Sequence, residues 1–446
     1  MELLVKPSKS EESLFESLYK KIDTNTAVVG VIGMGYVGLP NIISKAKRGN
    51  SVIGFDLDES KVNMVNRGGS YISDVKSEEL SNLVLDRKKI FATSDFSLLS
   101  NVDVILICVP TPIDEYKQPN LSYIKKASID ILRYAEKGAL VILESTTYPS
   151  TTEDYIVKNA VARGLNVGED FFVAYSPERI DPSNKTYNVD NTPRIVGGHT
   201  SRCTQLAEKF IGGSVLPVSS TKVAEMSKVY ENTFRYVNIA LANELTLICN
   251  KMGLDPWEVI EASKTKPYGF MPFYPTAGVG GHCIPVDPYY LSWYSKKFNC
   301  NAQMIELAGE INNKMSDYAV DRINGILNSE KLTLFGSKIA ILGASYKKDI
   351  SDVRESPIFR LYESLIRMGA NITIYDPHVD SIRIKDTIVN IEDIDYNELG
   401  NYDVVVLLTA HSDFNYYKIA DKSRNIFDTR DGFKEVGRFK GNYYKM

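Results

Sequence analysis

The stretch AVVGVIGMGYVGLP at residues 27–40 begins as an apolar run and continues through three glycines, Gly33, Gly35 and Gly38. An apolar run of this kind predicts a buried strand, and the G-x-G-x-x-G spacing after it predicts a tight turn into a helix. The glycines allow that turn, let a pyrophosphate approach the backbone, and permit close helix–strand packing. The segment therefore predicts the start of a dinucleotide-binding α/β unit.

A second apolar run, SVIGFD, ends at Asp56, which lies 21 residues beyond Gly35. The dinucleotide fold places at about this point the carboxylate that holds the adenosine ribose. A carboxylate repels a 2′-phosphate, and no Arg or Lys follows Asp56 until Lys61. The sequence therefore predicts NAD rather than NADP as the cofactor.

Three further apolar runs, within residues 102–111, 139–147 and 171–179, end in polar turns. This pattern is typical of buried parallel strands, and ligands of such sheets bind at the carboxyl ends of the strands. Thr111, Thr146 and Glu178 fall at those ends. For the two threonines, a structural role in holding the turns is an equally good interpretation.

A single cysteine, Cys283, stands in GVGGHCIPVDPYY at residues 278–290, after a run of glycines and four positions before Asp287. Glycines let another backbone or a ligand come close, and the prolines fix the local chain. If a helix begins with Pro285 in its first turn, its positive end favours a thiolate at Cys283. The motif predicts a nucleophile, although a small core residue remains the alternative.

Residues 221–252 contain neither Gly nor Pro, and apolar residues recur at helical spacing, which predicts one helix of about thirty residues. Lys228 and Asn232 are four apart and share a face of it, for which a solvated surface is the ordinary explanation. A second strand–turn–helix series starts at residue 338 and predicts another open α/β sheet with one turn glycine, Gly343. Its basic loop at 347–349 suits either phosphates or solvent.

The composition of the whole chain excludes several classes of protein. It has 446 residues, with 52 basic and 56 acidic side chains and no long Lys/Arg run, so we expect no nucleic-acid or membrane-surface partner. Residues 1–26 lack the apolar core of a secretion signal, and no stretch reaches the ~18 apolar residues of a membrane span. Five scattered cysteines favour the reducing cytoplasm, and His282-Cys283 lacks the spaced partners of a metal site.

The predicted fold class is α/β, with two Rossmann-like doubly wound domains joined by a long central helix. We expect an N-terminal helical extension at 1–26, an NAD-binding domain at 27–218, and a central helical, dimerising region with the cysteine loop at 219–330. A second Rossmann-like domain is expected at 331–446. The apolar residues on several sides of the central helix favour a homodimer or higher homo-oligomer.

Seven ordered motifs together resemble the nucleotide-sugar 6-dehydrogenases, the family of UDP-glucose, UDP-N-acetylglucosamine and UDP-N-acetylmannosamine dehydrogenases. They are GMGYVGLP (33–40), VPTP (109–112), ESTTYP (144–149), SPER (176–179), EMSKVYEN (225–232), GGHCIPVDP (280–288) and KKDISDVRES (347–356). Within the family, TKPYGFMPFYP (265–275) looks most like bacterial and archaeal UDP-N-acetylglucosamine 6-dehydrogenases. Val286 also stands where UDP-glucose enzymes usually have lysine.

The resemblance implies a four-electron oxidation of the sugar C6 alcohol to a carboxylate with two NAD⁺. Cys283 would hold the intermediate aldehyde as a thiohemiacetal and then as a thioester. Lys228 and Asn232 match the pair that stabilises negative charge on the C6 oxygen. Asp287 matches the carboxylate that assists a water, Glu178 the acid of proton transfer and thioester hydrolysis, and Thr146 a threonine near that water.

The resemblance also implies which residues bind the two ligands. The implied cofactor residues are Gly33, Gly35, Tyr36, Val37, Gly38, Asp56, Thr111, Thr146 and Arg354. The implied residues for the UDP-sugar are Glu178, Lys228, Asn232, Phe270, Gly280, Lys347 and Arg430. No metal is implied.

The sequence departs from the family pattern at three places. Pro182 stands where family members with a related segment have a second glutamate, with only Asp181 nearby, and residues 275–278 read PTAG in place of PGPG. His282 precedes the nucleophile, and we interpret it as shaping the loop rather than activating the thiol. The resulting hypothesis is a UDP-N-acetylhexosamine 6-dehydrogenase for polysaccharide synthesis. The alternatives are a UDP-glucose 6-dehydrogenase and a non-catalytic nucleotide-sugar-binding regulator.

Overall fold

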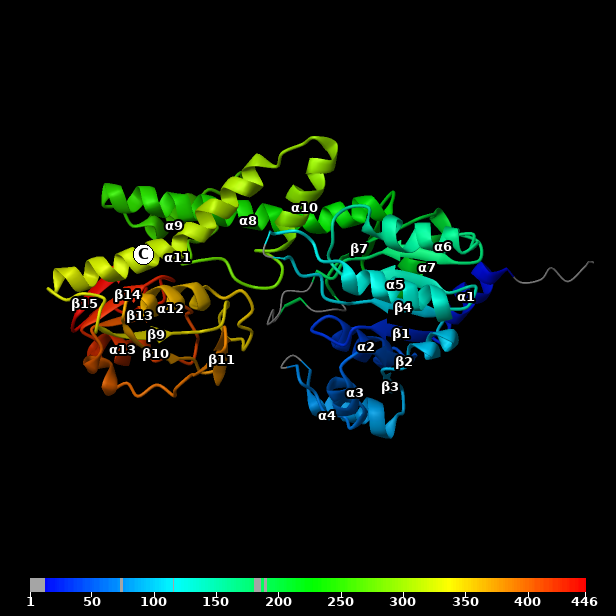
Figure 1. Ribbon diagram of the computed structural model, residues 1–446, viewed down its shortest axis with the longest axis horizontal. Helices are drawn as coiled ribbons and strands as arrows, with labels where there is room; N and C mark the ends of the chain where they lie inside the picture. The colour runs from blue at the N-terminus through cyan, green and yellow to red at the C-terminus, as the bar shows by residue number, and fades with distance from the viewer. Residues whose placement is uncertain (1–12, 73–74, 115, 180–185, 188–190) are drawn as a thin grey trace, which may run out of the picture. The chain divides into compact units, whose positions relative to one another are not determined.

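The computed structural model describes residues 13–72, 75–114, 116–179, 186–187 and 191–446. The chain divides into two compact units, Met1–Val229 and Tyr230–Met446, and the division falls inside helix α8 (Thr221–Met252). In Figure 1 the first unit runs from blue to green and the second from green to red.

The first unit is built on one eight-stranded sheet of order β3-β2-β1-β4-β5-β6-β7-β8. Every pair in it is parallel except β6 with β7. The first six strands have the order of the doubly wound dinucleotide fold, whose switch point lies between β1 and β4. The strands are β1 Val28–Ile32, β2 Ser51–Phe55, β3 Ile90–Thr93, β4 Val104–Ile107, β5 Leu140–Leu143, β6 Phe172–Tyr175, β7 Arg194–Gly198 and β8 Val215–Pro217.

One apolar core of the first unit combines residues of β1, β4 and β5, such as Val31, Leu106 and Ile142, with helical residues such as Leu39 and Leu206. All four residues of β4 and of β5 are buried, which explains their uninterrupted apolar sequence. The helices are α1 Leu14–Asp23, α2 Gly38–Lys47, α3 Glu59–Asn66, α4 Ser77–Ser81, α5 Ser122–Tyr134, α6 Lys158–Ala162 and α7 Ser201–Ile211, with π-helical turns at Asn82–Asp86 and Glu153–Val157 and a 3₁₀ helix at Phe96–Asn101.

The second unit contains a five-stranded sheet of order β10-β9-β13-β14-β15, in which every pair is parallel. This is the other common doubly wound order, with its switch point between β9 and β13. The strands are β9 Lys338–Leu342, β10 Asn371–Tyr375, β13 Val404–Leu407, β14 Asn425–Asp428 and β15 Asn442–Lys445, beside the antiparallel hairpin of β11 Ser381–Ile384 and β12 Thr387–Asn390.

The remaining helices of the second unit are α9 Pro256–Lys264, α10 Asp287–Ser295, α11 Gln303–Ser329, α12 Pro357–Arg367 and α13 Tyr416–Lys422, with 3₁₀ helices at Lys296–Phe298 and Glu398–Asn401. The predicted fold class, two doubly wound α/β domains with a long central helix, is confirmed. The start of the helix after Cys283 was predicted wrongly, since α10 begins at Asp287 with Pro288, not Pro285, in its first turn. Within the described part of the chain, no helix is long and apolar enough to cross a membrane.

Candidate active site

The glycine turn between β1 and α2 is shaped by one positive φ, one close approach and one open position. Gly33 has a φ of +92°, and a Cβ at Gly38 would lie 1.8 Å from the carbonyl oxygen of Gly33. A Cβ at Gly35 would meet no protein atom within 4 Å. The backbone at Gly35 therefore faces open space at the N-terminus of α2, where a phosphate is favoured.

Asp56 follows β2 and is joined directly to the glycine turn. Its Oδ2 accepts a 2.9 Å hydrogen bond from the backbone N–H of Met34, and Lys61 Nζ lies 4.0 Å from the same oxygen. Tyr71 donates a 2.5 Å hydrogen bond from its hydroxyl to the carbonyl of Met34. An open glycine, a helix N-terminus and a carboxylate at the end of β2 together fit a dinucleotide.

The next two residues of the glycine motif differ in exposure. Tyr36 is exposed, whereas Val37 is half-buried and precedes α2. The carbonyl of Val37 accepts a 3.1 Å hydrogen bond from the side-chain amide of Asn41. Val37 thus fixes the first turn of α2, while the Tyr36 ring lies at the surface of the turn.

The two predicted threonines lie together at the carboxyl ends of β4 and β5. Thr111 is buried, and its Oγ1 donates a 2.8 Å hydrogen bond to the carbonyl of Thr146. This bond ties the two turns beside the switch point, so Thr111 has the turn-holding role that the alternative interpretation gave it. That role is compatible with a ligand contact by either residue.

Glu178 follows β6 and belongs to a buried group of charges that the sequence motifs did not reveal. Its Oε1 accepts a 2.7 Å hydrogen bond from the N–H of Arg179, and Arg194 Nη1 lies 3.4 Å from its Oε2. Arg194 Nη2 also donates a 2.7 Å hydrogen bond to Glu144. The one sequence signal for this group was Arg194 itself, a charged residue that begins the otherwise apolar run RIVGG. Residues 181 and 182, where the family's second glutamate is replaced, lie outside the described residues.

Burial and charge act in opposite directions on Arg194. Burial lowers the pKa of its guanidinium, but the carboxylates of Glu144 and Glu178 outweigh that effect, and the net pKa is raised. Arg194 therefore stays a cation inside the protein.

Helix α8 presents Lys228 and Asn232 one turn apart, and both side chains are buried. The solvated-surface interpretation of this pair is therefore wrong. The amide Nδ2 of Asn232 donates a 2.5 Å hydrogen bond to Oδ2 of Asp287. Among the predicted catalytic residues, the structure thus brings Asn232 and Asp287 into direct contact.

Cys283 is half-buried and lies in a turn directly before α10. Its carbonyl accepts hydrogen bonds of 3.1 Å from the N–H of Val286 and 2.9 Å from the N–H of Asp287. The turn therefore fixes the backbone between the thiol and the carboxylate. Burial and the nearby charge of Arg354 lower the pKa of His282, so this imidazole is neutral at pH 7.

The glycines before Cys283 lie against the loop after β9. A Cβ at Gly280 would come within 2.5 Å of Tyr346 Cβ and 2.8 Å of the Glu355 carbonyl oxygen. Gly281 has a φ of +95° and donates a 2.9 Å hydrogen bond from its N–H to the carbonyl of Arg354. The structure therefore joins the cysteine loop to the 346–356 loop, which carries two of the predicted nucleotide-binding residues.

The other predicted ligand residues of the second unit are less concentrated. Lys347 follows β9 and Arg430 follows β14, both at carboxyl ends of parallel strands. Arg354 is paired with Asp352 at 2.7 Å. Arg430 Nε donates a 2.8 Å hydrogen bond to a backbone carbonyl, and burial lowers its pKa to about 10 against the opposing charge of Asp428. Phe270 is exposed, in the segment between α9 and α10.

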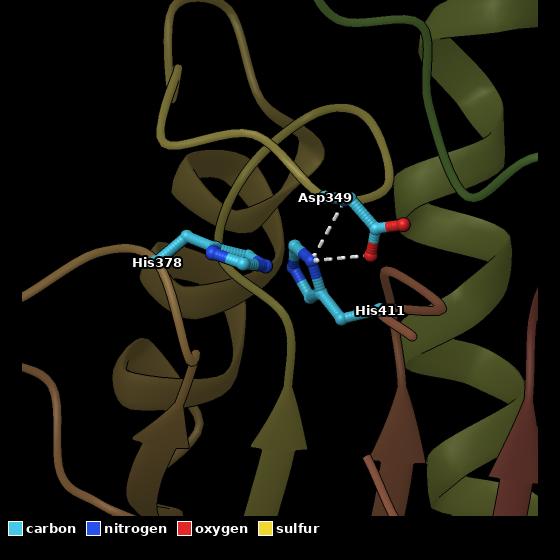
Figure 2. A group of neighbouring side chains, drawn as sticks. All are labelled: Asp349, His378 and His411. Carbon is cyan, nitrogen blue, oxygen red and sulfur yellow. Dashed lines mark hydrogen bonds and ion pairs between the residues drawn. The ribbon is translucent and has the colours of Figure 1, made fainter. Parts of the chain in front are cut away.

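Among the described residues, one group has potential metal-ligand atoms that all lie within 4.8 Å of one another: Asp349, His378 and His411 (Figure 2). However, His411 Nδ1 accepts a 3.0 Å hydrogen bond from the N–H of Asp349, and its Nε2 lies 3.1 Å from Asp376 Oδ2. An N–H can only donate, so the proton of His411 is on Nε2 and both ring nitrogens are already used. The group fastens the loop after β9 and offers no open set of metal ligands.

Comparison with known proteins identifies the family. Models of the UDP-glucose/GDP-mannose dehydrogenase family match along the chain, with the NAD binding domain at residues 27–211, the central domain at 222–314 and the UDP binding domain at 340–435. The chain belongs to the UDP-glucose/GDP-mannose dehydrogenase family. This dehydrogenase is an NAD-dependent oxidoreductase of nucleotide sugars, so the predicted family, enzyme class and cofactor are confirmed.

Alignments with individual relatives extend over most of this chain. It is 35% identical over 393 residues to the UDP-N-acetyl-D-glucosamine 6-dehydrogenase of Pseudomonas aeruginosa, covering 86% of this chain and 91% of that protein. It is 34% identical over 416 residues to the UDP-N-acetyl-D-mannosamine dehydrogenase of Pyrococcus horikoshii, covering 91% and 96%. A solved UDP-D-ManNAc dehydrogenase structure from Pyrococcus horikoshii matches with a TM-score of 0.84 and 32% identity, over 94% of this chain and 98% of that one.

Proposed function

We propose that this dehydrogenase oxidises C6 of a UDP-N-acetylhexosamine, UDP-N-acetylglucosamine or UDP-N-acetylmannosamine, to the carboxylate. The observation that carries the chemistry is the half-buried Cys283 in a fixed turn leading to the buried Asp287–Asn232 pair. The choice of sugar is supported by the named activities of the relatives and by Val286, where UDP-glucose enzymes usually have lysine.

Bound NAD⁺ would accept a hydride from C6 in each of two oxidation steps. Between them, the Cys283 thiolate adds to the C6 aldehyde, and the alkoxide takes up a proton to give a thiohemiacetal. Loss of the second hydride and a proton leaves a thioester. Water then adds to the acyl carbon, the C–S bond breaks, and the acid leaves as a carboxylate. The tether explains why a reactive aldehyde would not be released.

Lys228, Asn232 and Asp287 have surroundings that suit charge stabilisation. A buried lysine and an amide donor one turn apart favour negative charge on an oxygen placed between them. Asn232 also holds Asp287 in place, and Asp287 begins α10, where the helix dipole favours a carboxylate. We assign the first two to the C6 oxygen and Asp287, with Lys228, to the hydrolytic water.

Glu178 and Thr146 complete the assignment on the first unit. Glu178 takes the proton of the hydrolytic water, and Thr146 lies in the turn after β5 that Thr111 holds. Lys347, Arg354 and Arg430 are assigned to nucleotide contacts, and Phe270 and Gly280 to the substrate side. The remaining cofactor residues are those of the glycine turn, together with Asp56, Thr111 and Thr146.

The biological setting follows from the product. A UDP-activated uronic acid is a building block of glycans, and we assign it to the synthesis of a surface polysaccharide or glycan. We assign the enzyme itself to the cytoplasm. The exposed apolar side chains of α8, which include Tyr230, Leu241, Ile248 and Met252, are assigned to a homodimer or higher homo-oligomer.

The test is NADH production by the purified protein with UDP-N-acetylglucosamine, UDP-N-acetylmannosamine and UDP-glucose in separate reactions. We expect the highest kcat/KM with one of the N-acetylhexosamines. Activity with UDP-glucose alone would overturn the sugar assignment. Binding of all three sugars without NADH from any of them would instead favour the non-catalytic regulator.

A further inference from the structure

Three charged side chains form a buried group in the first unit, with Arg194 between Glu144 and Glu178. Arg194 Nη2 lies 2.7 Å from Glu144 Oε1, and Nη1 lies 3.4 Å from Glu178 Oε2. The side chains of Arg194, Glu144 and Glu178 are 5%, 1% and 11% exposed. One guanidinium therefore faces two carboxylates in a region with little water to screen them.

Strand pairing explains why Arg194 faces Glu178. Strands β6 and β7 are antiparallel, with Ala174 opposite Gly198 and Tyr175 opposite Gly197. Continued by three residues, the same register places Glu178 opposite Arg194. Arg194 Nη2 also lies 3.3 Å from the carbonyl oxygen of Ser176, which lies between Tyr175 and Glu178 in the sequence. The ladder itself ends at Tyr175, and Glu178 and Arg194 face each other just beyond that end.

Glu144 is held as the second partner of Arg194. Its Oε2 accepts a 2.8 Å hydrogen bond from the side-chain amide of Asn41 in α2 and a 3.4 Å contact from the thiol of Cys108. Burial and the charge of Glu144 raise the pKa of that thiol, so Cys108 remains a donor. With donors on both oxygens, Glu144 is a fixed counter-ion, and it anchors the guanidinium that reaches Glu178.

We propose that Arg194, anchored by Glu144, is a positioning residue that fixes the Glu178 carboxylate for hydrolysis of the enzyme-bound thioester. The inference rests on the proposed function, in which water adds to the acyl carbon, its proton passes to Glu178, and the C–S bond breaks to release the Cys283 thiolate. In this proposal Arg194 acts only through Glu178. Its effect is to keep Glu178 in one orientation, and misplacement of a catalytic group by about 1 Å costs about 10²-fold in rate.

The test compares variants that keep or remove the cation. Arg194→Lys keeps a positive charge, whereas the double variant Glu144→Gln/Arg194→Gln removes it without leaving Glu144 charged and unpaired. Arg360→Gln, which removes the exposed Arg360–Asp317 ion pair of the second unit, is the control for loss of an arginine. Each protein is measured for thermal unfolding, NAD⁺ Kd, sugar-nucleotide KM, kcat and, by rapid quench and intact mass, acylated Cys283.

We expect kcat of the double variant to fall about 10- to 100-fold relative to Arg360→Gln, with NAD⁺ Kd and sugar KM within about twofold and acylated Cys283 accumulating. Arg194→Lys should recover part of the rate. A kcat within about twofold of the control would overturn the proposal. So would a loss of kcat that follows the unfolded fraction, or one without acylated Cys283, because either indicates a structural role only.

Glu178→Gln, measured in parallel, separates this inference from the function on which it rests. If Glu178→Gln accumulates acylated Cys283 and the Arg194 variants do not, only the positioning role fails. If no variant, Glu178→Gln included, ever carries an acyl group on Cys283, the covalent route fails.

Discussion

The side-chain amide of Asn232 in α8 donates a 2.5 Å hydrogen bond to the carboxylate of Asp287 at the start of α10, and the two residues are 55 positions apart. Asn232 is 5% exposed and Asp287 2%. The bond ties the segment after Cys283 to the helix face that also carries Lys228. It therefore makes the position of Asp287 a property of α8 as well as of its own loop.

Replacing Asn232 by Ala should destabilise the protein because Asp287 loses a buried donor. The expected decrease in the free energy of unfolding is about 1–3 kcal/mol, measured by urea denaturation. Asp287→Asn should lower the free energy of unfolding by less, because the new side-chain amide still offers an oxygen to Asn232. An Asn232→Ala protein as stable as wild type would contradict the importance of this bond.

Gly280→Ala should disturb the contact between the cysteine loop and the loop after β9. The new Cβ would lie 2.5 Å from Tyr346 Cβ and 2.8 Å from a backbone oxygen, and neither atom is the end of a flexible side chain. We expect lower thermal stability and at least a several-fold higher KM for the UDP-sugar. Gly325→Ala is the matched control, since its Cβ meets nothing within 4 Å inside α11 and should stabilise the helix by up to about 1 kcal/mol.

Gly35→Ala should separate cofactor binding from folding. Its Cβ enters space free of protein atoms, so the unfolding temperature should stay close to that of wild type while the Kd for NAD⁺ rises about tenfold or more. Gly38→Ala, whose Cβ would lie 1.8 Å from the Gly33 oxygen, should instead destabilise the fold. Calorimetric titration with NAD⁺ checks the first variant, and unchanged affinity would place the pyrophosphate elsewhere.

Glu225 should make the stability of the protein depend on pH near neutrality. It is buried in α8 and accepts hydrogen bonds of 2.6 Å from the N–H of Ser150 and 2.8 Å from the N–H of Thr152. Burial raises its pKa from 4.5 to about 7, although these bonds lower it. The folded state therefore binds the proton more tightly than the unfolded chain does.

The resulting contribution to stability is fully present below about pH 4.5 and is lost as the pH rises through about 7. The loss amounts to about 3 kcal/mol at most. Unfolding free energies of wild type and Glu225→Gln from about pH 5 to about pH 8 provide the measurement, with wild type falling relative to the variant. A difference that stays constant across this range would show that Glu225 does not titrate there.

Local patterns were sufficient to predict much of the fold. The bounds of α8 agree with the stretch free of Gly and Pro, because a helix of 32 residues leaves a long periodic signal. The β1–glycine–α2–β2 unit and the position of Asp56 were also predictable, because residues close in sequence set their geometry. Apolar runs located the parallel strands but gave no indication that β7 is antiparallel to β6.

One missed feature depends on a contact between distant residues, and another on a local turn. Arg194 contacts Glu144, 50 positions away in the sequence, and no short motif marks that contact. Pro285 is the local case, because a proline suits the first turn of a helix. The chain instead forms a turn in which the Cys283 carbonyl accepts two N–H groups, and this delays the start of α10 to Asp287.

The central claim is that Cys283 carries the sugar between its two oxidations. The most direct measurement is the yield of NADH per UDP-uronic acid, together with the rate of acid release, for wild type and Cys283→Ser with the preferred sugar. The account predicts two NADH per acid from wild type and, from Cys283→Ser, a rate of acid release lower by several orders of magnitude. Acid release by Cys283→Ser at the wild-type rate would contradict it.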